Sequence, residues 1–73
     1  MIRLKVKEVA AAKGIGQGKL ARLADMDVKT VKRVYRDPYA EISTFTLDKF
    51  AKALGVDASE LIESVPDQPP EKS

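Results

Sequence analysis

Residues that end helices recur along this chain and divide it into short segments. Glycine favours the left-handed conformation that closes a helix, and a residue that precedes proline is pushed out of the helical region. Between these breaks, apolar residues repeat at helical spacing. The chain is therefore expected to fold into several short helices. The breaks fall at Gly14–Gly16, Asp25–Asp27, Asp37-Pro38 and Gly55.

Five helices are predicted from this pattern. They lie near residues 5–13, 17–24 and 28–36, from Ser43 to about Leu54, and from Asp57 to about Glu63. Asp27, Ser43 and Asp57 are of the types that cap helix N-termini. Before the first helix, apolar and basic residues alternate, which allows a short extended start. The expected fold class is all-α, a compact bundle of about five short helices.

The length of the chain, 73 residues, allows one domain with a compact core. Its 44% hydrophobic and 33% charged residues are typical of a globular protein. After Pro66 the sequence reads DQPPEKS, which is polar and too poor in apolar groups to pack. We therefore expect a domain over residues 1–65 and a flexible polar tail over residues 66–73.

The sequence contains neither cysteine nor histidine. Disulfides, thiolate or imidazole metal sites and nucleophiles paired with histidine are therefore excluded. An enzyme would need carboxylate or lysine chemistry in a cleft that so small a domain is not expected to form, so neither an enzyme nor a cofactor is predicted. No apolar run is long enough to span a membrane, and no signal peptide is evident. A cytoplasmic protein is expected.

Charge is distributed unevenly along the chain. Residues 13–36 carry seven Lys or Arg against two Asp, whereas residues 37–73 carry eight acidic residues against three basic ones. A basic half indicates a polyanionic partner. Chance variation of surface charge explains the distribution equally well, so the charge balance alone does not decide between them.

Residues 17–36 have the layout of two helices joined by a tight turn, the unit that presents a helix to the major groove of DNA. Leu20 and Ala24 are expected to pack the first helix, and the small Ala21 allows the two helices to cross closely. Met26 is expected to fill the turn. Val31 and Val34 are expected to anchor the second helix to the core.

Basic side chains share the opposite face of the predicted helix 28–36. At about 100° per residue, with Val31 at 0°, Val34 falls near 300° and Tyr35 near 40°. A basic stripe on a helix anchored by its other side suits a groove lined by phosphates. An ordinary solvated face usually mixes charges of both signs, so the stripe favours DNA. Between about 100° and 200° lie Lys29, Lys32, Arg33 and Arg36.

Several motifs occur in order: Gly14-Ile15-Gly16-Gln17, Leu20-Ala21, Thr30-Val31-Lys32-Arg33 and Ala51-Lys52-Ala53-Leu54-Gly55-Val56. In these motifs and their spacing, the chain resembles the Cro/repressor-type (Xre-like) helix-turn-helix proteins of bacteria and phages, especially the small stand-alone members. The resemblance implies a lambda-repressor-like DNA-binding domain. It further implies sequence-specific binding of double-stranded DNA and regulation of transcription, with residues 28–36 as the recognition helix.

The resemblance also implies roles for individual residues. Positions that read bases in the major groove are Val28, Lys29, Lys32 and Arg33, of which Arg33 suits a bidentate contact with guanine. Contacts to the DNA backbone, which position the domain without reading its sequence, are implied for Gln17, Lys19, Thr30, Arg36 and Tyr39.

The chain departs from the family pattern at two places. Asp25 stands where the family usually has a glycine in the turn, and aspartate tolerates the left-handed conformation at some cost. Ala10 and Tyr35 stand where the family often has an Arg–Glu ion pair, so packing is expected to replace that pair. Outside these motifs, Lys49 and Lys52 are expected to be solvated.

A single module of this kind buries only about 600–1,000 Å² on DNA. Tight binding is therefore expected to need either a homodimer on a palindromic site or a partner protein. The alternative function is a protein-interaction or antitoxin-like module with the same fold, in which the acidic C-terminal half makes the contacts and DNA binds weakly or not at all.

Overall fold

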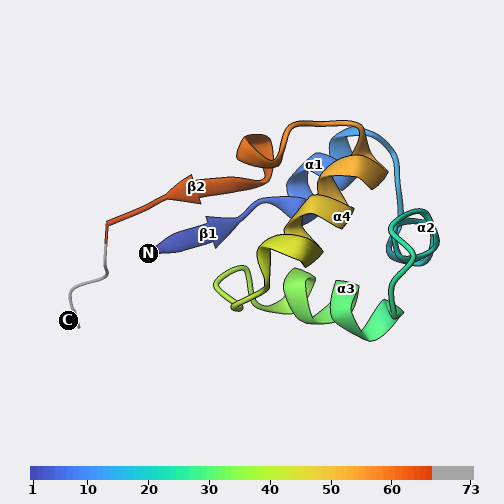
Figure 1. The fold of residues 1–73 in the computed structure, drawn as a ribbon, viewed down its shortest axis with the longest axis horizontal. Coiled ribbons are helices and arrows are strands. Elements are labelled where there is room, and N and C mark those ends of the chain that lie inside the picture. The colour runs from blue at the N-terminus through green and yellow to red at the C-terminus, as the bar shows by residue number, and fades with distance from the viewer. Residues whose placement is uncertain (67–73) are drawn as a thin grey trace.

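A computed structural model describes residues 1–66 of the chain. Figure 1 shows four α-helices gathered into one body, with a two-stranded β-ribbon at one end. Apart from Pro66, the predicted tail lies outside the described residues. In chain order the elements are β1 (Ile2–Leu4), α1 (Val6–Ala12), α2 (Gln17–Leu23), α3 (Val28–Arg36), α4 (Thr44–Leu54), the 3-10 turn η1 (Ala58–Leu61) and β2 (Ile62–Ser64).

Helices α1, α2 and α4 end in the same way, with one residue in the left-handed conformation. These residues are Gly14, Asp25 and Gly55, with φ of 69°, 53° and 68°. In each case the next N–H along the chain donates to a carbonyl five residues earlier, over 2.9, 3.0 and 3.0 Å. This closure satisfies carbonyls that the helix itself leaves free. The predicted glycine ends of the first and fourth helices are therefore confirmed.

The predicted N-caps are also confirmed. The side chains of Asp27, Ser43 and Asp57 each accept a hydrogen bond from a backbone N–H two or three residues ahead, over 2.9, 3.0 and 3.0 Å. The Glu60 side chain accepts a hydrogen bond from the Asp57 N–H and completes a capping box. Local side-chain chemistry therefore sets where α3, α4 and η1 begin.

The fifth helix and the all-α class are corrected by the structure. The segment after Asp57 makes only the 3-10 turn η1, and Ile62 then adopts an extended conformation with φ of −135°. Ile62–Ser64 pairs with Ile2–Leu4 in an antiparallel ribbon, with Leu4 opposite Ile62. The physical reason is that the two ends of the domain meet, so a ladder satisfies the backbone groups that a further helical turn would have satisfied locally.

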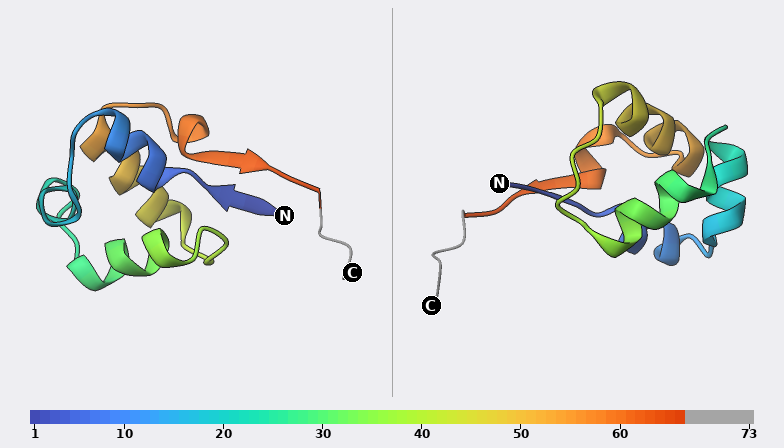
Figure 2. Two further views of the ribbon diagram at one scale, coloured as in Figure 1. Left: turned by 180° about the vertical axis from the view of Figure 1, so that it is seen from behind. Right: turned by 90° about the horizontal axis from the view of Figure 1, so that it is seen from below.

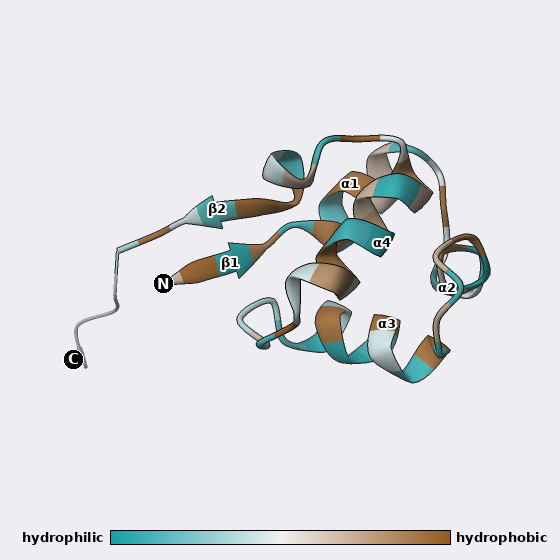
Figure 3. Ribbon diagram, viewed as in Figure 1, coloured by the Kyte–Doolittle hydropathy of each residue, from teal (hydrophilic) through white to brown (hydrophobic). Residues whose placement is uncertain are grey.

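The core lies between the helices and the inner end of the ribbon. Figure 3 shows the apolar segments of α1, α3 and α4 together with the inner part of the ribbon, and Figure 2 shows the same body from behind and from below. Small residues such as Ala10, Ala21 and Ala51 are buried there and allow the helices to approach closely. The largest fully buried side chains are Phe50, Leu20, Leu61, Val6 and Val31.

No helix in the described part of the chain is both long enough and apolar enough to cross a membrane.

Candidate nucleic-acid interface

Helices α2 and α3 form the predicted helix-turn-helix. Ala21 is 5% exposed where the two helices pack, and Met26 in the turn is half-buried against the core. Val31 and Val34 are buried beneath α3. The predicted anchoring of α3 is confirmed, and it determines which face of the helix meets solvent.

The exposed face of α3 carries the predicted basic stripe. Lys29, Lys32, Arg33 and Arg36 are all exposed, and Val28 at the start of the helix is 37% exposed. Within residues 1–66, ion pairs join Arg3 to Glu8 and Glu63, and Lys52 to Asp48, but none involves α3. Within this described part of the chain, no carboxylate is ion-paired with a cation of the stripe.

A hollow beside α3 brings residues of three helices together. It measures about 410 Å³, and its lining includes Gln17 at the start of α2 and Tyr35, Lys32 and Arg36 of α3. Partial burial raises the pKa of Tyr35. The fifth lining residue is Lys7 of α1, which sequence reasoning missed because the packing of α1 against α3 has no local signal. Three cations from two helices surround a space large enough for an anion.

Other predicted contact residues lie elsewhere. Lys19 is exposed on α2, but it does not line this hollow. Thr30 is half-buried on α3. Tyr39 is 44% exposed in the loop between α3 and α4 and borders a different groove, beside the β-ribbon. The structure therefore brings Gln17, Lys32 and Arg36 together and leaves Lys19 and Tyr39 apart from them.

The Arg33 side chain also holds the loop that follows α3. Its Nη2 donates a hydrogen bond to the carbonyl oxygen of Glu41 over 3.0 Å. A guanidinium has five N–H donors, so this contact uses only part of its capacity. Arg33 therefore connects the basic stripe to the start of α4.

The turn between α2 and α3 is secured from α4. Asp25 has the left-handed conformation predicted from the family pattern, and its carbonyl oxygen accepts a hydrogen bond from Lys49 Nζ over 3.3 Å. The same Nζ lies 4.9 Å from the centre of the Phe45 ring. Lys49 is therefore half-buried and bonded rather than simply solvated, which corrects the prediction; Lys52 is 79% exposed, as expected.

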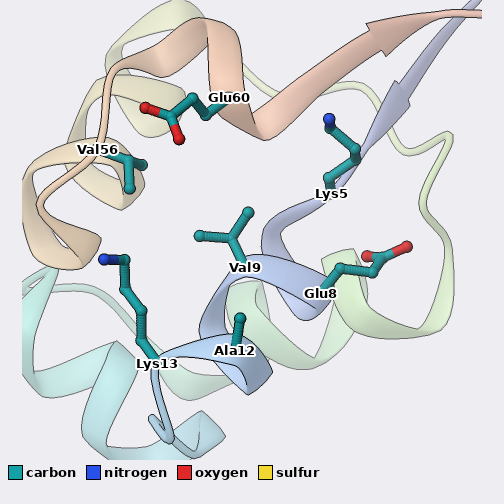
Figure 4. A pocket seen from close by; sticks show the side chains of 7 residues that line it. All are labelled: Lys5, Glu8, Val9, Ala12, Lys13, Val56 and Glu60. Atoms are coloured by element: carbon teal, nitrogen blue, oxygen red, sulfur yellow. The ribbon is translucent and has the colours of Figure 1, made fainter.

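A second hollow lies away from the basic stripe, between α1 and the segment that joins α4 to η1. Figure 4 shows Val9, Ala12 and Val56 in it together with side chains of both charges. The cations there are Lys5 and Lys13, and the anions are Glu8 and Glu60. Mixed charge of this kind is typical of a solvated surface. Within residues 1–66, no group of three or more acidic side chains is placed to hold a metal ion.

Comparison with known proteins agrees with this geometry. No curated protein and no solved structure matches the chain significantly. Residues 5–67 match the model of a protein family described as the Cro/C1-type HTH DNA-binding domain. The match spans α1 to β2, including the helix-turn-helix and the basic stripe. The chain therefore belongs to the family of Cro/C1-type helix-turn-helix DNA-binding domains.

Proposed function

We propose that this protein regulates transcription by binding double-stranded DNA in a sequence-specific manner, with α3 in the major groove. One observation carries the proposal: the exposed face of α3 holds four cations that make no ion pair within residues 1–66, on a helix whose other face is buried. Phosphates on both sides of the groove attract such a surface, whatever the DNA sequence. Occupancy of the site then blocks or recruits the transcription machinery.

Base contacts are assigned to the part of α3 that can reach the floor of the groove. Val28 is exposed at the start of the helix, where an apolar side chain suits a thymine methyl group. Lys29, Lys32 and Arg33 supply donors to the acceptors of guanine. Because Arg33 also bonds the Glu41 carbonyl, its guanidinium is partly oriented before DNA binds.

Backbone contacts are assigned around the hollow between α1, α2 and α3. Gln17 and Arg36 line it, and the added Lys7 brings a further cation from α1. Lys19, Thr30 and Tyr39 remain proposed phosphate contacts outside the hollow. Contacts of this kind fix the position of the helix on the duplex and supply most of the salt-dependent affinity.

An NMR titration tests the proposal. The labelled protein is mixed with a DNA duplex of mixed sequence at low and at moderate salt, and amide shifts are followed. We expect salt-sensitive shifts centred on Gln17 and on residues 28–36. Shifts confined to the acidic residues after 37, or no shifts at low salt, would contradict DNA binding and favour the protein-interaction or antitoxin-like alternative.

A pair of charge reversals sharpens the test. Lys32→Glu changes the basic stripe, whereas Lys13→Glu makes the same charge change at the hollow of Figure 4, away from α3. We expect Lys32→Glu to weaken DNA binding much more than Lys13→Glu. Equal losses would show that net charge alone attracts the DNA.

A further inference from the structure

The first turn of α3 lies ahead of the residues that anchor this helix to the core. Val28 and Lys29, two of the residues proposed to read bases, are exposed, and Thr30 is half-buried. The first buried residue of the helix is Val31. The placement of this first turn therefore depends on the connection between α2 and α3, residues 24–27, which Figure 1 shows at the lower right of the molecule.

The connection has few contacts that hold it. Asp25 and Asp27 are exposed, and Met26 is half-buried. The N–H of Met26 donates to the carbonyl of Ala21 over 3.0 Å. Asp25 has φ of 53°, in the left-handed region that disfavours L-residues. A strained conformation of this kind persists only where the surrounding structure holds it in place.

A side chain of α4 supplies a further contact to the connection. Lys49 Nζ donates a hydrogen bond to the carbonyl oxygen of Asp25 over 3.3 Å and lies 4.9 Å from the centre of the Phe45 ring. Within residues 1–66 this ammonium forms no ion pair. A cation is favoured at the C-terminal end of a helix such as α2, and the face of an aromatic ring attracts it as well.

The contact with Lys49 also accounts for Phe45. This side chain is 68% exposed, so burial in the core does not explain an aromatic residue at the position. Phe45 precedes Lys49 by four residues, which places the two side chains one above the other on the same face of α4. The ring therefore supports the ammonium on one side, while the carbonyl of Asp25 binds it on the other.

We propose that Phe45 and Lys49 form a latch that positions the first turn of α3 and so determines how selectively it reads bases. The inference rests on the proposed DNA binding. Lys49 is a positioning residue that acts through the carbonyl of Asp25 and does not itself contact DNA. Side chains that read bases must be placed to within about 0.5 Å, whereas attraction to phosphates does not depend on sequence. Loss of the latch is therefore expected to lower selectivity more than general DNA binding.

Two variants on the same helix test the latch. Lys49→Met keeps the apolar part of the side chain and removes the charge. Lys52→Met makes the same change where the lysine is 79% exposed, and serves as the matched control. Duplexes that the native protein prefers are selected from a random pool, and the specificity ratio is the affinity for a selected duplex divided by that for its shuffled sequence.

We expect the specificity ratio to fall about fivefold in Lys49→Met, which corresponds to about 1 kcal/mol, and to stay near the native value in Lys52→Met. Lys49→Arg should restore most of the ratio, because arginine keeps the charge and stacks on aromatic rings. A specificity ratio that is the same in Lys49→Met and Lys52→Met would overturn the proposal.

The salt dependence of binding separates positioning from direct contact with DNA. A lysine that neutralises a phosphate contributes about 0.9 to the slope of log affinity against log salt. We therefore expect Lys49→Met and Lys52→Met to have equal slopes. A slope smaller by about 1 in Lys49→Met would make Lys49 a phosphate contact and would also overturn the proposal.

Amide hydrogen exchange in the free protein tests the latch without DNA. The Met26 N–H should exchange about fivefold faster in Lys49→Met and in Phe45→Leu than in the native protein, because local opening of the connection becomes easier. The Ile15 N–H, which donates to the carbonyl of Ala10 at the end of α1 in the same way, is the control and should not change. Unchanged exchange at Met26 would overturn the latch. Faster exchange without any selected duplex would instead support the latch and contradict the proposed DNA binding.

Discussion

Replacement of Asp25 by glycine is expected to stabilise the domain. Asp25 occupies the left-handed region at φ of 53°, in the position where α1 and α4 have Gly14 and Gly55. This region costs an L-residue about 1–2 kcal/mol, and aspartate is in general at the lower end because a short polar side chain is able to hydrogen-bond nearby backbone. Glycine removes this cost, but it gives up about 0.4–1 kcal/mol through the greater freedom of the unfolded chain. The net gain is about 0.5 kcal/mol.

Urea denaturation measures the effect. For small proteins the free energy of unfolding falls by about 1–3 kcal/mol per molar urea, so a gain of about 0.5 kcal/mol raises the midpoint by a few tenths molar. In thermal unfolding, 1 kcal/mol shifts Tm by about 4–8 °C in a domain of this size, so Asp25→Gly is expected to raise Tm by about 2–4 °C. Asp25→Ala is expected to lower the midpoint, since alanine keeps the steric cost without a polar side chain.

Asp25→Asn separates backbone conformation from charge. Asparagine also tolerates the left-handed region, so its stability should stay near that of the native protein. The lost negative charge should instead strengthen DNA binding, which an anisotropy titration measures. If Asp25→Gly proved no more stable than Asp25→Ala, the left-handed conformation would not be the source of strain, and the reasoning would be wrong.

Three further predictions address the core, the interface and the N-cap of η1. Val31→Asp is expected to abolish cooperative unfolding, because Val31 is fully buried and a carboxylate there would have no partner; a normal melting curve would mean that α3 is oriented differently. Lys7→Gln is expected to reduce the slope of log affinity against log salt by about 1, whereas Lys13→Gln should leave it unchanged; equal slopes in both variants would remove Lys7 from the interface. Hydrogen bonds from the Ser59 hydroxyl and N–H lower the pKa of Asp57 below its usual 3.8. The charged Asp57 therefore contributes its full stabilisation above pH 3.8. This contribution disappears as the pH falls through the lower pKa of Asp57 in the folded state. Urea midpoints of the native protein and Asp57→Asn should therefore differ at neutral pH and converge in acid; a constant difference would contradict this origin.

Helix starts, helix ends and helix faces that depend on a few neighbouring residues could be predicted from the sequence. Asp27 and Ser43 begin helices because their side chains bond N–H groups two or three positions ahead. Gly55 ends α4 because it adopts the left-handed conformation without a steric cost. The basic face of α3 follows from helical periodicity once Val31 is assigned to the core.

Features that depend on distant segments could not be predicted. Leu4 and Ile62 pair across the ribbon although 58 positions separate them, and the capping box that precedes Ile62 signals only the start of a turn. Lys7 enters the candidate site through the packing of α1 near α3. Lys49 bonds the turn carbonyl of Asp25, 24 positions away. Each of these features depends on a tertiary contact. Periodicity and capping rules consider only neighbouring residues, so they do not predict it.

The β-ribbon nevertheless bears directly on the candidate DNA interface. Leu4 at the end of β1 donates its N–H to the carbonyl of Pro38, just after α3, and the next N–H, of Lys5, donates to the carbonyl of Leu61; both distances are 2.7 Å. The chain entering α1 is therefore fixed on one side to the segment just after α3 and on the other side to η1. Lys7 follows two residues later, so these backbone bonds set its position relative to Lys32 and Arg36. The ribbon thus does more than join the two ends of a small domain: it helps to place Lys7 beside Lys32 and Arg36, in the hollow where we propose that a DNA phosphate binds.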